Sequence, residues 1–285
     1  MLDSAVWKVG GRDLPLSSPL VMGVLNVTPD SFSDASLHLD AGAAVAAGLA
    51  MVEDGAAIVD VGGESTRPYA SSVSADSEAG RVLPVVEELA SRGVVVSIDT
   101  SKPAIAARAI DAGAAIVNDV TGLRDREMAA ICASAKVGVV IMHMQGDPTT
   151  MQDNPTYGDV VAEVRDFLSR QCLRAIDAGI GIESIAIDPG IGFGKSFDHN
   201  LAIMRSLEAF THLGYPVLVG TSRKGFLGSI LEPIRGHTEP SDRDAATAAT
   251  VATAVLRGAS IVRVHNVALG VDVAMTAKAM VPLRS

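Results

Sequence analysis

Residues Leu20–Val27 read Leu-Val-Met-Gly-Val-Leu-Asn-Val, a nearly unbroken apolar run that is followed by a polar loop. A short run of this kind, rich in β-branched side chains, is typical of a strand that is buried on both faces. Seven similar runs recur, each followed by a polar or Gly-rich loop and then by a longer Ala-rich stretch with helical spacing. The seven are Ala57–Val61, Val94–Ile98, Ala115–Asn118, Val137–His143, Ser184–Ile187, Pro216–Gly220 and Ser260–Val264.

This alternation of strands and helices predicts an α/β fold. Parallel βα units are expected, and eight of them close most naturally into a (β/α)8 TIM barrel. A doubly wound open sheet is the alternative, but the first loop lacks the GxGxxG fingerprint of a dinucleotide-binding fold. Val6–Leu16 alternates apolar and polar residues around Gly10-Gly11, which predicts a β-hairpin that plugs the bottom of the barrel. We expect a single domain over residues 1–285, with residues 1–18 as the hairpin extension.

Composition excludes several classes of protein. The chain is 48% hydrophobic with a mean hydropathy of +0.32, yet its apolar runs are far shorter than the roughly 20 residues that cross a bilayer. Residues 1–8 lack the pattern of a secretory signal, so we expect a cytoplasmic protein. A formal net charge of −10 disfavours binding to nucleic acid or to an anionic membrane. Cys132 and Cys172 stand alone, which predicts reduced packing residues rather than a disulfide or a zinc site.

Polar residues lie at only one end of the predicted strands, the carboxyl end. In a TIM barrel the active site is built at the carboxyl ends of the strands, whereas the opposite ends of these runs begin with Gly, Ala, Val or Ser. Loops are polar in general, but carboxylates, amides and cations placed directly on strand ends exceed what loop composition requires. The residues at this mouth are Asn26 with Asp30 and Ser31, Glu64–Arg67, Asp99–Lys102, Asn118 and Asp119, His143, Asp188, Ser222–Lys224, and Arg263 with His265.

Two kinds of group are mixed in this mouth. Asp99, Asn118 and Asp188 can accept hydrogen bonds from the donor-rich edge of a flat heterocycle such as an amino-pyrimidinone. A second set can donate to phosphate oxygens or carbonyls. This set comprises Arg67, Ser222, Lys224, Arg263 and His265. A heterocycle that bears phosphate fits both sets.

Seven ordered motifs, placed in successive barrel loops, closely resemble those of the dihydropteroate synthase family. The similarity runs from about Leu20 to the C-terminal helix, and the ordered set is far more specific than any one motif. The motifs are Asn26-Val27-Thr28-Pro29-Asp30-Ser31-Phe32-Ser33-Asp34, Gly62-Gly63-Glu64-Ser65-Thr66-Arg67-Pro68, Ser97-Ile98-Asp99-Thr100, Asn118-Asp119, Asp188-Pro189-Gly190-Ile191-Gly192-Phe193-Gly194-Lys195, Ser222-Arg223-Lys224 and Arg263-Val264-His265.

The resemblance implies three subsites. A pterin ring would meet Asp99, Asn118, Asp188 and Lys224 at its edge, Arg263 at its face, and Met142 and Phe193 as apolar walls. The diphosphate would be bound by Asn26, Thr66, Arg67 and His265, with Asn26 also matching the family's Mg²⁺ ligand, and Val264 is a further expected substrate-binding residue. The p-aminobenzoate, with which sulfonamides compete, would lie near Phe32, Arg67, Pro68, Ser222 and Lys224.

The resemblance also implies a dissociative transfer to p-aminobenzoate. Diphosphate leaves first, the pterin methylene becomes a stabilised cation, and the aniline nitrogen then attacks. The residues agree, because they offer cations and carboxylates but no Ser-His-Asp constellation. Asp99, Lys224 and Arg67 are the expected catalytic residues, with Asp99 stabilising the cation. The family is usually homodimeric, and Asp244–Leu256 and Asp272–Met280 could present an apolar face to a second subunit.

Some of these residues have alternative interpretations. Asp99 or Asp188 could cap the helix that follows it. His143 fits a core or hinge histidine, so it is not expected to be catalytic, and Asp119 must point to the other side of its strand from Asn118. The glycines of 190–195 could bring backbone close to a ligand or form a purely structural turn.

The chain also departs from the family pattern at three places. Ala35-Ser36 replaces a frequent Gly-Gly pair, Tyr69 replaces a frequent Gly, and Asn266 replaces a frequent Asp near the diphosphate region. Two other functions therefore remain open. A corrinoid-dependent methyltransferase uses a related pterin-binding barrel but needs no diphosphate site, and a pterin-binding relative could have lost turnover.

Overall fold

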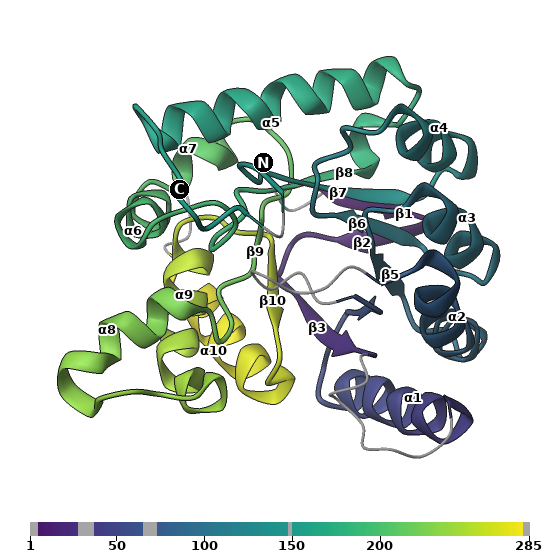
Figure 1. Ribbon diagram of the computed structural model, residues 1–285, viewed down its shortest axis with the longest axis horizontal. Helices are drawn as coiled ribbons and strands as arrows, with labels where there is room; N and C mark the ends of the chain where they lie inside the picture. The colour runs from purple at the N-terminus through teal and green to yellow at the C-terminus, as the bar shows by residue number, and fades with distance from the viewer. Residues whose placement is uncertain (1–4, 28–36, 65–72, 148–149, 282–285) are drawn as a thin grey trace.

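Eight parallel strands form the centre of the molecule. The computed structural model describes residues 5–27, 37–64, 73–147 and 150–281. The strands are hydrogen-bonded in the order β8-β7-β6-β5-β4-β3-β10-β9, and a parallel bridge between Ile187 and Val217 joins the two outer strands (Figure 1). The sheet is thus a nearly closed barrel, and the open doubly wound sheet is excluded. The strands are β3 (Leu20–Asn26), β4 (Ile58–Gly62), β5 (Val96–Asp99), β6 (Ile116–Asp119), β7 (Gly138–Met142), β8 (Ile185–Asp188), β9 (Leu218–Val219) and β10 (Ile261–Val264).

Each observed strand falls within two residues of its prediction at either end. The shortest is β9, which covers only two residues of the predicted Pro216–Gly220. Pro216 cannot donate a backbone hydrogen bond, but its carbonyl accepts from Ile187 N at 2.9 Å and so takes part in the closure of the barrel.

Helices surround the strands, and their buried faces pack on the outside of the barrel. Side chains cap several of their first turns, as Asp125 does for Glu127 N and Asp159 for Val161 N. The helices are α1 (Leu37–Glu53), α2 (Ala75–Ser91), α3 (Pro103–Asp111), α4 (Arg126–Ala135), α5 (Val160–Asp177), α6 (Phe197–Arg205), α7 (Glu208–Thr211), α8 (Gly225–Arg235), α9 (Asp244–Leu256) and α10 (Val267–Met280), with short 3₁₀ turns η2 (Ile182–Ser184) and η3 (Pro240–Arg243).

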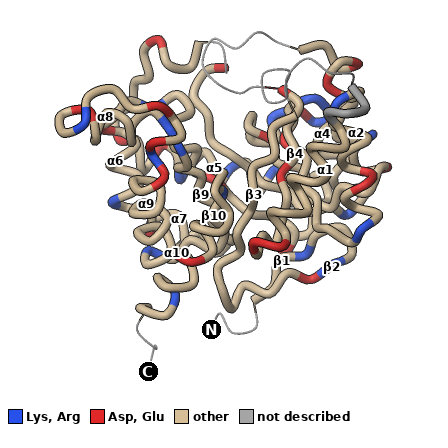
Figure 2. The backbone as a smooth tube through the Cα atoms, turned by 90° about the horizontal axis from the view of Figure 1, so that it is seen from below, with Lys and Arg blue, Asp and Glu red and all other residues tan. Residues whose placement is uncertain are grey.

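The predicted N-terminal hairpin closes one end of the barrel (Figure 2). It consists of β1 (Val6–Val9) and β2 (Arg12–Pro15), with Gly10 and Gly11 both at positive φ, as a two-residue turn between such strands requires. Trp7 is fully buried and packs with side chains from the amino ends of the strands, including Ile58 and Ile261. Its Nε1 donates to Ser184 O at 3.0 Å. The amino end of the barrel is therefore filled.

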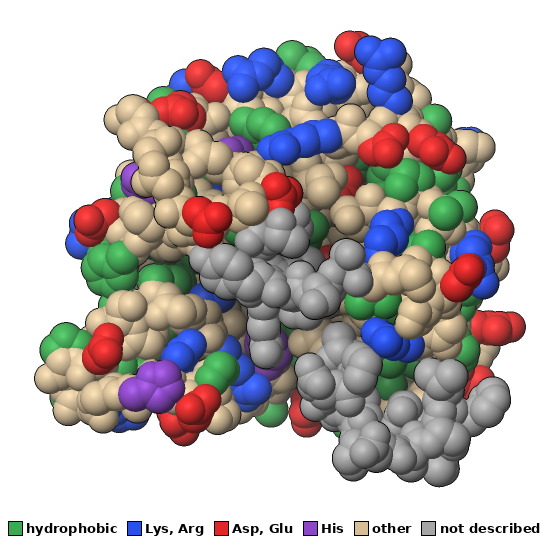
Figure 3. All heavy atoms as spheres, in the orientation of Figure 1, with side chains coloured by type: hydrophobic (Ala, Val, Ile, Leu, Met, Phe, Trp, Pro, Cys, Tyr) green, Lys and Arg blue, Asp and Glu red, His purple; other side chains and the backbone are tan. Residues whose placement is uncertain are grey.

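The two cysteines lie in the core. Cys132 and Cys172 are free and buried, and burial raises the pKa of each thiol to about 12. Among the described residues, no helix is long and apolar enough to cross a membrane. Basic and acidic side chains are interspersed over the described part of the face shown in Figure 3.

Candidate active site at the carboxyl end of the barrel

The predicted acceptors lie in one layer at the carboxyl ends of the strands. Strand register pairs Asn26 with Gly62, Gly62 with Asp99, and Asp99 with Asn118. Farther around the barrel, Met142 pairs with Asp188. Residues that are far apart in the sequence therefore meet at one mouth, as the sequence predicts.

Arg263 crosses the barrel and binds two carboxylates. Its Nε lies 2.6 Å from Asp60 Oδ2, and its second guanidinium nitrogen lies 2.8 Å from Asp99 Oδ2. Asn118 Nδ2 also donates to Asp60 Oδ2, at 3.1 Å. These contacts fix the plane of the guanidinium and the orientation of the Asn118 amide.

Asp60 was not identified from the sequence. It lies in the middle of β4, within the run Ile58–Gly62, rather than after its end. The signal was present, because a lone carboxylate in an apolar buried strand must have a partner. Asp60 is fully buried, and Arg263 and Asn118 are those partners.

Burial shifts the pKa values of three central groups, Asp99, Lys224 and Asp188. Burial raises the pKa of Asp99 to about 7, although Arg263 opposes the shift and Asp60 adds to it. Burial lowers the pKa of Lys224 to about 8, against the attraction of Asp188. Burial likewise raises the pKa of Asp188. Asp99 and Lys224 therefore titrate near neutral pH, as is common at catalytic sites.

Lys224 and Phe193 lie beside Asp188. The ammonium group of Lys224 donates to Ile191 O and lies 4.5 Å from the centre of the Phe193 ring. Phe193 packs against a small apolar cluster that contains Met142. The two predicted apolar walls, Met142 and Phe193, are thus in the same cluster next to the predicted ring-edge groups.

Neither Asp99 nor Asp188 caps the helix that follows it. Lys102 occupies the N-cap of α3 without a side-chain hydrogen bond, and Ser196 caps α6. Asp188 Oδ1 instead accepts from Gly190 N at 2.7 Å, within the turn that leaves β8. The capping alternative is therefore wrong for both residues.

Glycines in the segment 190–195 approach protein backbone. Gly190 and Gly194 have positive φ, and a Cβ built on them would lie 1.8 Å from His143 O and 2.4 Å from Gln145 O, respectively. Any side chain there would collide with the segment after β7. The structural interpretation of these two glycines is thus supported.

His143 and Asp119 have the structural roles expected of them. His143 is buried, its Nδ1 lies 2.9 Å from Lys195 Nζ, and burial lowers its pKa to about 2. Asp119 accepts from Thr121 N at 2.8 Å and from Leu123 N at 3.0 Å, which closes the loop after β6.

Ser222 and His265 contact each other at the ends of β9 and β10. Ser222 Oγ accepts from His265 N at 3.2 Å and lies 2.9 Å from His265 Nδ1. The Val264 side chain, in contrast, belongs to the apolar cluster under α9 and α10, because alternate residues of β10 face opposite sides. Its side chain therefore does not reach the barrel interior that Arg263 faces.

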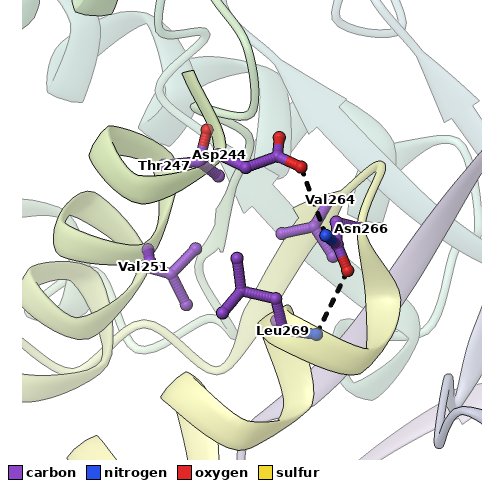
Figure 4. Close-up of a pocket in the computed structure, with 8 residues that line it drawn as sticks. Asp244, Thr247, Val251, Val264, Asn266 and Leu269 are labelled. Atoms are coloured by element: carbon purple, nitrogen blue, oxygen red, sulfur yellow. Dashed lines mark hydrogen bonds between the residues drawn. The ribbon is translucent and has the colours of Figure 1, made fainter. Parts of the chain in front are cut away.

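Asn266 contributes to the packing of α9 against α10. Its Oδ1 caps α10 by accepting from Leu269 N, and its Nδ2 donates to Asp244 Oδ2 at 3.2 Å (Figure 4). Asp244 also accepts two hydrogen bonds from Arg223. These residues flank a small cavity of 10 Å³ between the two helices. An amide, unlike a carboxylate, can donate to Asp244.

The Asn266→Asp variant should be about 1 kcal/mol less stable at neutral pH, because two carboxylates would then face each other. Urea denaturation measures the loss, which should shrink in high salt. Asn266→Ser keeps a capping oxygen without the charge and serves as the control. Equal losses in the two variants would show that repulsion is not the cause.

Lys102 forms a second, partly buried ion cluster beside the mouth. Its Nζ lies 2.7 Å from Glu64 Oε2, 2.6 Å from Glu78 Oε2 and 2.8 Å from Val73 O. Thr100 Oγ1 donates to the other oxygen of Glu78 at 2.7 Å. The charge of Lys102 is thus balanced within the protein.

Several predicted site residues lie outside the described part of the chain. They are Phe32, Thr66, Arg67 and Pro68, together with the departures Ala35-Ser36 and Tyr69. Their predicted roles remain predictions.

Known proteins resemble this chain over nearly its whole length. A model of the family described as pterin binding enzyme matches residues 22–265. The dihydropteroate synthase of Escherichia coli K12 is 46% identical over 260 residues, which cover 90% of each chain. The Xanthomonas albilineans dihydropteroate synthase with 4-aminobenzoic acid has a TM-score of 0.90 and 42% identity, covering 99% of this chain and 100% of that one. The Yersinia pestis dihydropteroate synthase in a sulfonamide drug complex has a TM-score of 0.89 and 39% identity, covering 96% and 98%.

Proposed function

Because this chain belongs to the pterin-binding enzymes and, among them, to the dihydropteroate synthases, we propose that it condenses 6-hydroxymethyl-7,8-dihydropterin diphosphate with p-aminobenzoate. The products are 7,8-dihydropteroate and diphosphate, in folate biosynthesis. The observation that carries the proposal is the meeting of Asp99, Asn118 and Asp188 with two cations at one mouth. These cations are Lys224 and Arg263.

The pterin ring is expected to bind between the ring-edge groups and the apolar walls. Asp188 and Asn118 offer oxygens to the amine and ring N–H groups, while Arg263 faces the ring. Met142 and Phe193 exclude water from its sides. Met142 is buried and Phe193 is partly buried, which supports a deep pterin subsite, with Lys224 between the pterin and p-aminobenzoate.

The reaction proceeds without a side-chain nucleophile. The bond between the pterin methylene carbon and the diphosphate oxygen breaks, and its electron pair leaves with the diphosphate. The aniline nitrogen then forms a bond to that carbon and loses one proton to solvent. Asp99 stabilises the positive pterin, and Lys224 together with Arg67, whose position lies outside the described residues, is expected to favour the negative leaving group.

A Mg²⁺ ion fits the diphosphate subsite next to Asn26. Mg²⁺ commonly binds through one or two protein oxygens together with substrate phosphates and water. Asn26 supplies such an oxygen. Gly62 is the register partner of both Asn26 and Asp99, and it has no side chain between them. A Cβ built at Gly62 would lie 3.8 Å from Asn26 Oδ1 and 3.6 Å from Asp99 Cβ. The ion would neutralise charge on the leaving group. His265 would add a donor here, and Thr66 and Arg67 are expected to do the same.

Release of diphosphate tests this function. We expect release from the pterin substrate with Mg²⁺ to depend on p-aminobenzoate, and sulfonamides to compete with that aniline. A methyltransferase would ignore the aniline, and a non-catalytic pterin-binding protein would bind the pterin without release. Either result would overturn the proposal.

We expect kcat/KM to have a bell-shaped dependence on pH, with a maximum between about 7 and 8. Asp99 must be ionised, so activity falls as pH drops below its pKa of about 7. Lys224 must be protonated, so activity falls as pH rises above its pKa of about 8. Initial rates across this range measure both limbs. In Lys224→Arg the alkaline limb should move to higher pH, and an unchanged limb would exclude Lys224 as its origin.

A cytoplasmic homodimer is the expected form of the enzyme. Leu256, Met275 and Met280 of α9 and α10 are exposed by 50%, 41% and 67%, respectively. Apolar side chains exposed on neighbouring helices support a subunit contact there. Sedimentation analysis of the purified protein should give twice the chain mass, and a monomer at micromolar concentration would contradict the dimer.

A further inference from the structure

Asp60 lies one layer beneath the predicted pterin subsite. On β4 it is two residues before Gly62, the register partner of Asp99, and it pairs in register with Ser97 of β5. Asp60 therefore forms part of the floor of the site. Its side chain contacts β10 through Arg263 and β6 through Asn118.

A single oxygen of Asp60 fixes both neighbours. Oδ2 accepts from Arg263 Nε at 2.6 Å and from Asn118 Nδ2 at 3.1 Å. Arg263 also donates to Asp99 at 2.8 Å, so its planar guanidinium is held at two points by two carboxylates. Two fixed hydrogen bonds leave the guanidinium little rotational freedom.

The contact with Asn118 decides which end of its amide can serve a ligand. An amide has a donor end and an acceptor end, and rotation by half a turn exchanges them. A carboxylate accepts hydrogen bonds and, while ionised, cannot donate. Asp60 therefore accepts from one of the two Nδ2 hydrogens and fixes which end of the Asn118 amide faces it, so that Oδ1, at the other end, is the acceptor offered to a ligand.

We propose that Asp60 is a positioning and specificity-determining residue for the pterin: it orients Asn118 to present its acceptor oxygen and holds Arg263 at the ring face. This inference rests on the proposed pterin subsite. A heterocycle whose edge carries amine and ring N–H donors matches the acceptor. A heterocycle with acceptors at that edge would face oxygen and be rejected.

Asp60→Asn tests the role with almost no change in shape. The new amide can still accept from Arg263, but its own NH₂ group favours an acceptor from Asn118, which would turn that amide round. We expect the Kd for the pterin diphosphate to rise at least about tenfold, equivalent to about 1.4 kcal/mol. The KM for p-aminobenzoate should stay within about twofold, a selectivity that general loss of structure would not give.

Ser97→Ala is the matched control. Ser97 is the buried register partner of Asp60, and its Oγ has no hydrogen-bond partner within the described residues. Its replacement alters the same floor without touching Arg263 or Asn118, so pterin affinity should stay within about twofold. An equal loss in Ser97→Ala and Asp60→Asn would overturn the specific role of Asp60.

A double-mutant cycle tests whether Asp60 affects pterin binding through Asn118. If Asp60 acts through Asn118, then Asp60→Asn should weaken pterin binding much less in an Asn118→Ala background than in the native one. Additive losses would overturn this route. The wild-type protein gives a test that needs no folded variant: NMR should show that one NH₂ proton of Asn118 keeps its hydrogen bond to Asp60 when pterin is bound, and loss of that hydrogen bond would overturn the proposal.

These results are separate from the proposed function. Diphosphate release by the wild-type protein tests the function. Wild-type release with unchanged pterin affinity in folded Asp60→Asn would reject only the role of Asp60, whereas the absence of pterin binding by the wild type would reject the site itself.

Discussion

Asp99→Ala should lower kcat by at least about a hundredfold, a loss of about 2.7 kcal/mol in transition-state stabilisation. Asp99 ends β5 at the mouth, one of its oxygens binds Arg263, and the other has no hydrogen-bond partner among the described residues. A negative oxygen in a water-poor site stabilises a developing cation strongly. The proposed pterin cation is the species that would gain this stabilisation.

Aniline-dependent diphosphate release at saturating substrates measures this loss. Asp99→Asn, which keeps the shape but removes the charge, should be impaired to a similar extent. Asp125→Asn changes an exposed carboxylate that caps α4, and it should retain full kcat. A fall of less than about tenfold in Asp99→Ala would show that this carboxylate does not stabilise the transition state.

Lys102→Met should destabilise the protein by about 3 kcal/mol. The Glu78 carboxylate is fully buried and lies 2.6 Å from Lys102 Nζ. Removal of one partner leaves a buried charge without compensation, which commonly costs about 3 to 5 kcal/mol. Thr100 remains as a donor to Glu78, so we expect the lower part of that range.

Urea denaturation measures the change in the free energy of unfolding. Lys8→Met is the matched control, since the Lys8–Glu183 pair has side chains exposed by 51% and 44% and should contribute far less to stability than a buried pair. Replacing Glu78 by Gln in the Lys102→Met variant should restore part of the stability. A Lys102→Met loss no larger than that of Lys8→Met would contradict the buried-charge argument.

The sequence predicted the barrel because its strands are local, apolar and separated by helical stretches. Residues such as Asp188 could be predicted for the site, since each follows a strand directly. Asp60 could not be found in this way, because its partner Arg263 is 203 residues away and comes next to it only when the barrel closes.

Hydrogen bonds and ion pairs between distant segments likewise could not be predicted from sequence patterns. Asn266 was interpreted through the charge it removes near the diphosphate, whereas the structure shows it donating to Asp244. The ion cluster of Lys102 likewise joins segments that only the folded sheet brings together. The sequence pattern therefore predicts which side chains lie at the strand ends, whereas their hydrogen-bond and ion-pair partners are set by contacts that form only in the folded barrel.

The hairpin under the barrel has a consequence for the order of events during turnover. Trp7 fills the amino end, so in the described part of the chain the barrel is open to the site from the carboxyl end. In the proposed arrangement the pterin occupies the deeper position, so we expect it to enter before p-aminobenzoate, and a bound aniline would block its arrival. Dihydropteroate must leave by the same route, so accumulated product should compete with the incoming pterin and slow the enzyme when the next reaction of the pathway is saturated.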